Sequence, residues 1–154
     1  MNLVDELHAV SRALSDAGIP YAICGGVAVT IHGATRTTKD IDLLVAPEDV
    51  PRALLAVRPL GYTYVALPMA FDAGTPNERR VQRVSKLEDG TSVSLDLLHE
   101  SGGLAGALSD RIHLELPEGP LFVVSRATLE RMKRLAGRAQ DLADLEKLEH
   151  PDDD

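Results

Sequence analysis

Residues 36–45 read Arg-Thr-Thr-Lys-Asp-Ile-Asp-Leu-Leu-Val and set two aspartates, Asp40 and Asp42, at the start of an apolar run. In an extended strand, residues i and i+2 share a face, so the two carboxylates project side by side while Ile41 turns into a core. Two adjacent carboxylates repel each other unless a cation neutralises them, and oxygen ligands suit Mg²⁺, which usually also holds substrate phosphates. The pair is a candidate centre for phosphoryl chemistry, although D-x-D alone is also common at the polar edge of a strand.

A third aspartate, Asp96, lies in the alternating run 93–98, on the second arm of a predicted hairpin. If this strand lies beside the one that carries Asp40 and Asp42, three carboxylates converge. Two Mg²⁺ ions roughly 3.5–4 Å apart can clamp the attacking and leaving oxygens of an in-line displacement. A carboxylate near the attacking hydroxyl can also take its proton. The alternative for Asp96 is a strand residue that faces solvent.

Helical and alternating patterns divide the rest of the chain. The predicted helices are 2–17, 27–32, 47–57 and a region from 125 onward that Gly137 can interrupt. The predicted strands are 21–24, 39–46, 62–67, 81–87, 92–98, 112–116 and 121–124, with Asp89-Gly90 as a hairpin turn. Residues 68–78 and 99–110 are predicted loops. This order predicts an α+β fold in which a mixed β-sheet is flanked by helices and followed by C-terminal helices.

Length and charge restrict the class of protein. A chain of 154 residues predicts one domain over 1–150, followed by a disordered acidic tail over 151–154. The formal net charge of −8 argues against broad, non-specific binding to nucleic acid. Basic residues still cluster locally, so a phosphate or an RNA end remains a candidate ligand. Those clusters are Arg79, Arg80, Arg83 and Lys86, and Arg126, Arg131, Lys133, Arg134 and Arg138.

The single cysteine, Cys24, excludes an internal disulfide. No apolar run approaches membrane-spanning length, and Met1 is not followed by a signal-peptide pattern. These features predict a cytoplasmic protein that does not bind a membrane. The histidines and the cysteine lack the spacing of zinc ligands.

A double glycine, Gly25-Gly26, stands between a predicted strand and a predicted helix. Glycine lets backbone approach a ligand closely, and N–H groups at a helix N-terminus favour anions; a simple tight turn is the alternative. Arg36 either contacts a phosphate or covers the surface. His32 is expected to cap or pack, whereas His99 follows the Asp96 strand closely enough to approach the site.

The segment 129–145 is the other informative stretch. At about 100° per residue, it predicts one polar stripe that includes Lys133, Asp141 and Asp144. One interpretation is an amphipathic helix with a wet face and local ion pairs, such as Arg138 with Asp141. The other is that Lys133, beside an apolar edge, reaches a triphosphate as a point charge.

Taken together, 24–28 and 32–45 resemble the polymerase-beta-type nucleotidyltransferase superfamily. Within it the sequence is most similar to the bacterial group around the AbiEii toxin nucleotidyltransferases. That group combines a G-G or G-S turn, an R-x-T-x-D-I-D strand and a later K-x-x-A-x-R-x-x-D-x-x-D-L helix, to which 133–145 corresponds. A glycine turn, paired aspartates, a third aspartate and a terminal helix in this order are more specific than any one of them.

The resemblance implies a nucleotidyltransferase-like sheet flanked by helices and transfer of a nucleoside monophosphate from an NTP such as ATP, with release of pyrophosphate. It implies that Asp40 and Asp42 bind Mg²⁺ and that Asp96 completes the metal site or acts as base. The roles implied for phosphate binding fall on Gly25, Gly26, Arg36 and Lys133.

The acceptor implied by the resemblance is a hydroxyl on RNA, protein or a small molecule. A role in a toxin–antitoxin or phage-defence system, with a cognate antitoxin protein as partner, also follows from the family alone. Two alternatives remain open. One is an antibiotic nucleotidyltransferase of the aminoglycoside or lincosamide type, and the other is a catalytically inactive module that binds a nucleotide or a partner.

Overall fold

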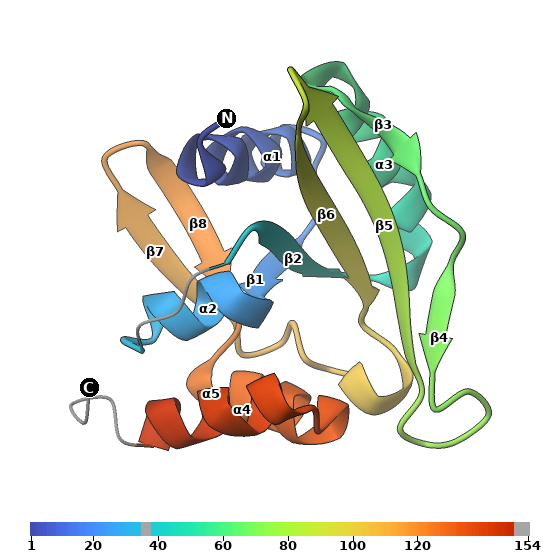
Figure 1. Ribbon diagram of the computed structural model, residues 1–154, viewed down its shortest axis with the longest axis vertical. Helices are drawn as coiled ribbons and strands as arrows, with labels where there is room; N and C mark the ends of the chain where they lie inside the picture. Colours follow the sequence, from blue (N-terminus) through green and yellow to red (C-terminus); the bar gives the residue numbers. More distant parts are fainter. Residues whose placement is uncertain (35–37, 150–154) are drawn as a thin grey trace.

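The computed structural model describes residues 1–34 and 38–149 (Figure 1). Its α-helices are α1 (Leu3–Asp16), α2 (Gly25–Ile31), α3 (Val50–Val57), α4 (Arg126–Ala136) and α5 (Ala139–Glu149), and its 3-10 turns are η1 (Pro47–Asp49), η2 (Arg58–Leu60) and η3 (Gly102–Leu104). The strands are β1 (Tyr21–Cys24), β2 (Asp40–Val45), β3 (Tyr62–Val65), β4 (Met69–Phe71), β5 (Arg79–Glu88), β6 (Thr91–His99), β7 (Ile112–Leu116) and β8 (Gly119–Val123). The predicted tail, 151–154, lies outside the described residues.

All eight strands form one mixed sheet in the order β3-β5-β6-β2-β1-β8-β7, with β4 also paired to β5. The pairs β2–β6 and β1–β8 are parallel, and the other pairs are antiparallel. Helices pack on this sheet, and α4 and α5 lie together at the opposite end of the molecule from α1 (Figure 1). The predicted α+β class is confirmed.

Most predicted elements differ from the observed ones by one or two residues at an end, and two larger differences lie near the aspartates. The predicted loop over 68–78 is wrong for Met69–Phe71, which form β4 against β5. Proline and glycine around these three residues signal a turn, and only the hydrogen bonds to β5 make them a strand. Helix α2 begins at Gly25 rather than at Val27, so both glycines belong to its first turn.

Side-chain caps fix the ends of the helices beside the sheet. The Oδ1 of Asn2 accepts hydrogen bonds from the backbone N–H groups of Val4 (2.9 Å) and Asp5 (3.3 Å) at the start of α1. The hydroxyl of Ser125 accepts one from the N–H of Thr128 (3.0 Å) at the start of α4. Helix α4 ends at Gly137, whose φ of +64° is the left-handed conformation that terminates helices. This turn is what directs α5 back against α4.

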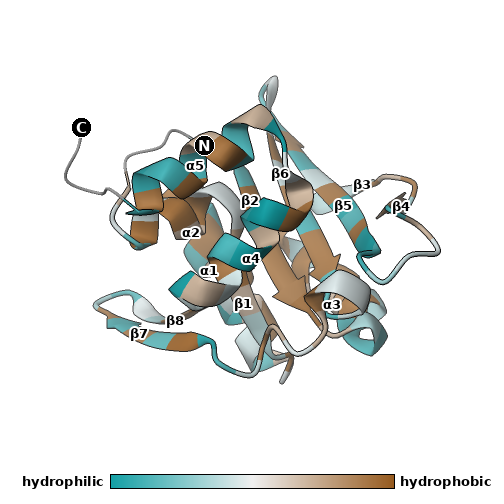
Figure 2. Cartoon of the chain, turned by 90° about the horizontal axis from the view of Figure 1, so that it is seen from below, coloured by the Kyte–Doolittle hydropathy of each residue, from teal (hydrophilic) through white to brown (hydrophobic). Residues whose placement is uncertain are grey.

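The core lies around the central strands β1, β2 and β6. Strand β1 is buried over its whole length, and Leu43, Leu44, Leu95 and Leu97 of β2 and β6 are inaccessible to solvent. Hydrophobic residues concentrate on these strands, and the surrounding helices carry both hydrophobic and hydrophilic residues (Figure 2). Burial of apolar surface on this scale is the main favourable term in folding, so it holds the central strands in a fixed register. Because this core is rigid, polar groups on the central strands also have fixed positions.

Helix α1 packs with α3, and α2 packs on β1 and β2. The Oε1 of Glu6 in α1 accepts hydrogen bonds from the hydroxyl of Tyr62 (2.9 Å) and from the Nζ of Lys86 (3.0 Å). Burial, together with the hydrogen bond to Glu6 as the smaller cause, raises the pKa of Tyr62. Among the described helices, none combines the length and apolar character needed to cross a membrane.

Candidate active site

The parallel pairing of β2 with β6 brings the three predicted aspartates together. Asp42 lies directly opposite Asp96, and Asp40 lies opposite Ser94. Residues directly opposite each other on paired strands share a face, as do residues i and i+2 of one strand. Asp40, Asp42 and Asp96 therefore share one face of the sheet, and the predicted neighbourhood of their two strands is confirmed.

Gly25 lies directly against the side chain of Asp42. Strand β1 runs antiparallel to β2, so Cys24 lies opposite Asp42 and the chain turns into α2 at the next residue. Gly25 has a φ of +65°, and a Cβ placed there would come within 2.7 Å of the Asp42 Cγ. A side chain at this position would clash with Asp42, and the positive φ also favours glycine. Glycine is therefore required for two separate reasons.

The guanidinium of Arg83 on β5 holds Asp96. Its Nε donates to one carboxylate oxygen of Asp96 (2.8 Å) and its Nη2 donates to the other (3.0 Å). This bidentate pair fixes the plane of the carboxylate. The hydrogen bond to Asp96 also raises the pKa of Arg83, which keeps the guanidinium charged. Each carboxylate oxygen retains a second lone pair for a metal ion or a proton.

Sequence reasoning placed Arg83 in a basic cluster and missed this role. The signal was available in the hairpin. A two-residue turn at Asp89-Gly90 sets opposite each other the residues that are equally distant from it, and Arg83 and Asp96 are such a pair.

The donor set of the site fits Mg²⁺ that is shared with a substrate. The described residues contain no group of three or more His, Cys, Asp or Glu side chains positioned to hold a metal ion by themselves. Asp40 and Asp42 supply two hard oxygen donors, and Mg²⁺ is usually bound by one or two carboxylates together with phosphate oxygens and waters. In this conformation Asp96 is directed to Arg83.

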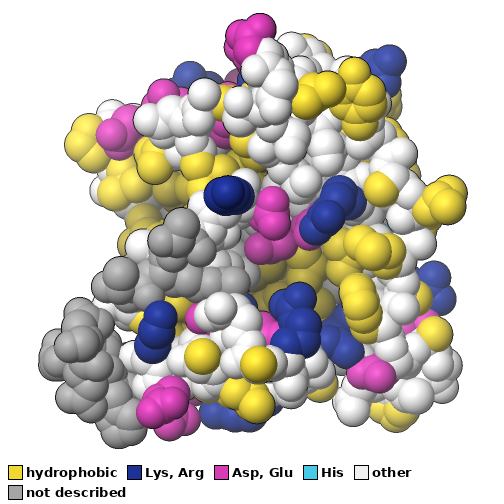
Figure 3. Space-filling view, viewed as in Figure 1, with side chains coloured by type: hydrophobic (Ala, Val, Ile, Leu, Met, Phe, Trp, Pro, Cys, Tyr) yellow, Lys and Arg dark blue, Asp and Glu magenta, His cyan; other side chains and the backbone are white. Residues whose placement is uncertain are grey.

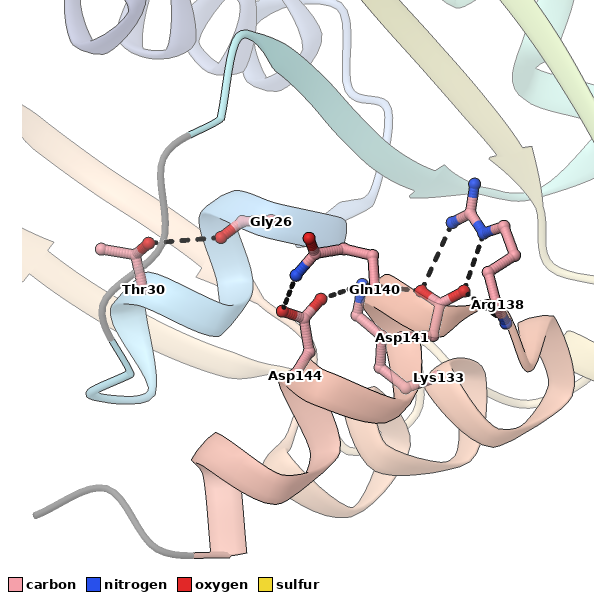
Figure 4. A network of polar contacts seen from close by, with 7 residues as sticks. All are labelled: Gly26, Thr30, Lys133, Arg138, Gln140, Asp141 and Asp144. Carbon is pink, nitrogen blue, oxygen red and sulfur yellow. Dashed lines mark hydrogen bonds and ion pairs between the residues drawn. The ribbon is translucent and has the colours of Figure 1, made fainter. Parts of the chain in front are cut away.

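A buried charge network links α4 to α5 (Figure 4), and three of its residues line the same cavity as the aspartates of β2 and β6. The Nζ of Lys133 lies 3.2 Å from an oxygen of Asp141 and 3.1 Å from an oxygen of Asp144. The Nε of Arg138 donates to Asp141 (2.7 Å), and the amide of Gln140 donates to Asp144 (2.8 Å). Burial raises the pKa of Asp141, but Arg138 and Lys133 outweigh it, so the pKa lies below its usual value.

The predicted single polar stripe is corrected by this network. Lys133 belongs to α4, whereas Asp141 and Asp144 belong to α5, because the chain reverses at Gly137. Lys133 is only 6% exposed, which is unusual for lysine and requires the two carboxylates. The predicted ion pair between Arg138 and Asp141 is confirmed.

A cavity of about 570 Å³ joins these groups. Figure 3 shows acidic side chains in a hollow of this face, with Lys and Arg side chains around them. The polar lining residues are Gly25, Gly26, Thr38, Asp40, Asp42, Arg79, Arg83, Asp96, Lys133, Arg138 and Asp141. Cys24 also lines it, but burial and the nearby Asp42 raise the pKa of its thiol, so it is no thiolate nucleophile at neutral pH.

Three other predicted positions have different outcomes. Arg36 lies outside the described residues. The Nε2 of His32 lies 2.9 Å from the carbonyl oxygen of Val124, which is the expected packing role. His99 lies at the end of β6 opposite Val45 and is not among the described residues that line the cavity.

Comparison with known protein families finds no match, and comparison with curated protein sequences finds none either. Solved structures do match. A candidate nucleotidyltransferase from Thermotoga maritima, TM1012, superposes with a TM-score of 0.63 at 13% identity, over 94% of this chain and 91% of that one. The lincosamide antibiotic adenylyltransferase LnuA, in its lincomycin-bound form, has a TM-score of 0.58 at 11% identity, over 96% of both chains.

The protein ANT(2")-Ia, in complex with adenylyl-2"-tobramycin, has a TM-score of 0.56 at 16% identity, over 96% of this chain and 88% of that one. At such identities the likeness is one of fold, and it extends over almost the whole length of this chain. The chain has the nucleotidyltransferase fold.

Proposed function

We propose that this chain is a Mg²⁺-dependent nucleotidyltransferase that transfers a nucleoside monophosphate from an NTP to a hydroxyl group. The observation that carries the proposal is the β2–β6 register, which sets Asp42 opposite Asp96 on one face of the sheet. The glycine turn at Gly25 lies against the same carboxylate. The nucleotidyltransferase fold of the whole chain supports the same chemistry, although a shared fold alone does not assign a function.

Asp40 and Asp42 are the proposed metal ligands. When bound, Mg²⁺ neutralises charge on the triphosphate and orients its oxygens. The two carboxylates share one face of β2, so they would supply the oxygen ligands for a cation that also binds the substrate phosphates.

Asp96 is the proposed base, or the third ligand of the metal. In the base role, a carboxylate oxygen of Asp96 takes the proton of the acceptor hydroxyl as that oxygen attacks the α-phosphorus. A new P–O bond forms to the acceptor, and the bond between the α-phosphorus and the bridging oxygen breaks to release pyrophosphate. Arg83 holds the carboxylate of Asp96 in one orientation through two hydrogen bonds.

The phosphate-binding side comprises Gly25, Gly26 and Lys133, with Arg36 assigned from the sequence alone. The backbone of the two glycines has no side chain to keep a phosphate away. Lys133 lines the cavity, and Asp141 and Asp144 orient its ammonium group as a point charge.

Two biological settings are compatible with this chemistry. Antibiotic nucleotidylation is supported by the match to LnuA over 96% of both chains. A toxin–antitoxin role with ATP or another NTP as donor, and with an antitoxin protein as partner, is supported by the motifs in 38–45 and 133–145. Growth arrest on expression, relieved by a neighbouring gene product, would favour the second setting.

The decisive assay measures label transfer from each α-³²P-labelled NTP in the presence of Mg²⁺. The acceptor pools are tRNA, cell protein, an aminoglycoside and a lincosamide. We expect transfer, with one pyrophosphate released per label, and we expect Asp42→Asn to reduce the rate at least a thousandfold because the metal loses a charged ligand. The matched control is Asp16→Asn, which makes the same chemical change at an exposed residue of α1.

Equal activity in the two variants would refute the assignment of Asp42. Binding of NTP without transfer to any pool would favour the alternative of an inactive nucleotide-binding module. The labelled pool identifies the acceptor class.

A further inference from the structure

One side of the cavity is apolar and belongs to the sheet. Its members are Met69 and Phe71 of β4, Val81 of β5 and Leu98 of β6, and together they form what we call the acceptor wall. Met69 pairs with Val81, and Val81 pairs with Leu98, so these three lie side by side across the strands. Leu98 is two residues beyond Asp96 on β6, which puts the wall on the face that carries the aspartates.

The strand order separates the acceptor wall from the glycine turn, with Asp42 and Asp96 between them. Across the sheet, β1 leads to Gly25, β2 carries Asp42, β6 carries Asp96, and β5 and β4 follow. In an in-line transfer the leaving pyrophosphate and the attacking hydroxyl lie on opposite sides of the α-phosphorus. With phosphates at Gly25 and the base at Asp96, the acceptor hydroxyl enters from the side of the wall.

The charges around the acceptor wall disfavour two classes of acceptor. Among the described lining residues on this side, the charged one beyond Arg83 is Arg79, whose Nη2 lies 2.6 Å from Asp72 and whose guanidinium lies 5.6 Å from the ring centre of Phe71. The two carboxylates next to the wall, Asp72 and Asp96, are already paired with Arg79 and Arg83, which disfavours a polycation. The two arginines on this side of the cavity, Arg79 and Arg83, are already paired with Asp72 and Asp96, which disfavours a polyanion such as RNA against the wall.

Exposure shows that the wall is open to a ligand. Phe71 is 47% exposed and Met69 is 38% exposed, although both are large apolar side chains. Figure 3 shows hydrophobic side chains bordering the acidic ones in the hollow. A cavity of about 570 Å³ that is apolar on one side and carries a few convergent polar groups is typical of small-molecule sites.

We propose that the acceptor is an uncharged small molecule that presents its hydroxyl next to an aromatic or aliphatic group, which packs on Met69 and Phe71. This inference rests on the proposed nucleotidyltransferase function and narrows its acceptor. Phe71 and Met69 are specificity-determining residues, and Arg79, whose guanidinium lies over the Phe71 ring, holds that ring in place.

The chain contains its own reporters for the test. It has three methionines, of which Met69 lies on the acceptor wall, Met132 lies across the cavity on α4, and Met1 lies at the terminus as a control. The protein is labelled with ¹³C in the methionine methyl groups, loaded with Mg²⁺ and a non-hydrolysable ATP analogue, and titrated while NMR spectra are recorded. The probe is phenyl β-D-glucoside, and its matched control is methyl β-D-glucoside, which has the same hydroxyls without the ring.

We expect phenyl β-D-glucoside to shift the Met69 resonance, to leave Met1 unchanged and to bind about tenfold more tightly than methyl β-D-glucoside. Phe71→Ala should remove that difference. Leu116→Ala, which truncates an exposed apolar residue on β7 at the other edge of the sheet, should preserve it. Equal binding of the two glucosides, or a shift confined to Met132, overturns the proposal.

The same titration is repeated with three other ligands: tobramycin, an RNA hexanucleotide and a capped serine tripeptide. Tighter binding of any of these at Met69 than of phenyl β-D-glucoside also overturns the proposal and identifies a different acceptor class. Failure of the proposed function is distinct, because the label-transfer assay then shows no transfer from any NTP to any acceptor pool. If label is transferred and phenyl β-D-glucoside leaves Met69 unchanged, only the acceptor inference fails.

Discussion

Gly25 is the residue at which the connection from β1 to α2 meets the carboxylate of Asp42. Its backbone has a positive φ, and the place of its missing Cβ is occupied by the Asp42 side chain. Because Gly25 has a hydrogen atom where other residues carry a Cβ, the Asp42 carboxylate can occupy this position. The same is not true of Gly18, which has a φ of +72° but no neighbouring atom within 4 Å of the place where a Cβ would stand.

Gly25→Ala should displace Asp42 and abolish binding of Mg²⁺ and nucleotide. It should also lower the free energy of unfolding by about 2 kcal/mol, from backbone strain and the clash. Gly18→Ala carries the same backbone cost without the clash, so it should lose about 1 kcal/mol and keep nucleotide binding. Urea denaturation and calorimetric titration with Mg²⁺ and ATP measure the two effects. Normal nucleotide binding by Gly25→Ala would contradict the role of this contact.

Arg83 acts through Asp96, so it is a positioning residue. Arg83→Leu should lower kcat strongly and leave KM for NTP nearly unchanged, because the proposed base Asp96 loses its fixed orientation while the proposed phosphate-binding residues are intact. The stability change should stay below about 1 kcal/mol, since the guanidinium is partly exposed. Arg80→Leu is the matched control, because the neighbouring Arg80 pairs with Glu78 at the surface. Steady-state kinetics that show the same kcat for both variants would refute the assignment.

Among the secondary-structure elements, the junction of α4 with α5 depends on Lys133. Its ammonium group is enclosed by the carboxylates of Asp141 and Asp144, which are 1% and 0% exposed. An ammonium group buried in this way stabilises the structure only while both partners are present. The network therefore links the relative position of the two helices to the lining of the candidate active site.

Lys133→Met should destabilise the protein by about 3 kcal/mol, because two buried carboxylates are left with less compensation. Arg134→Met removes a neighbouring cation that is itself exposed and whose partner, Glu130, also pairs with Arg126, and it should cost less than about 1 kcal/mol. Thermal and urea unfolding of both variants measure the difference. A loss of similar size in the two variants would show that the network contributes no more than a surface ion pair.

Across the molecule as a whole, the candidate site is assembled from segments that are distant in sequence. Strand β6 is inserted between β2 and β5, and α4 and α5 close the same cavity from the C-terminal part of the chain. Each contributing element is held by the apolar core, so the polar groups are pre-positioned by burial elsewhere. Ligand binding should therefore depend on the integrity of the entire fold.

Local pattern was enough to predict most of the elements, because helical and alternating periodicity are properties of short segments. The hairpin at Asp89-Gly90 and the helix break at Gly137 were both predictable in this way. Strand β4 was missed because three residues carry too little pattern, and their strand conformation comes from hydrogen bonds to β5. The contact of Gly25 with Asp42 could not be predicted, since it depends on the angle at which α2 leaves the sheet.

The amino-acid sequence was sufficient for the chemical groups, the elements that carry them and the side-by-side placement of Asp40 and Asp42, because strand geometry puts alternate residues on one face. It was not sufficient for two contacts: Asp96 opposite Asp42, and Lys133 buried between two carboxylates of the next helix. These contacts became known from the folded chain, because they depend on how separate elements pack together. Their register is selected by the burial of the whole apolar core rather than by any local preference.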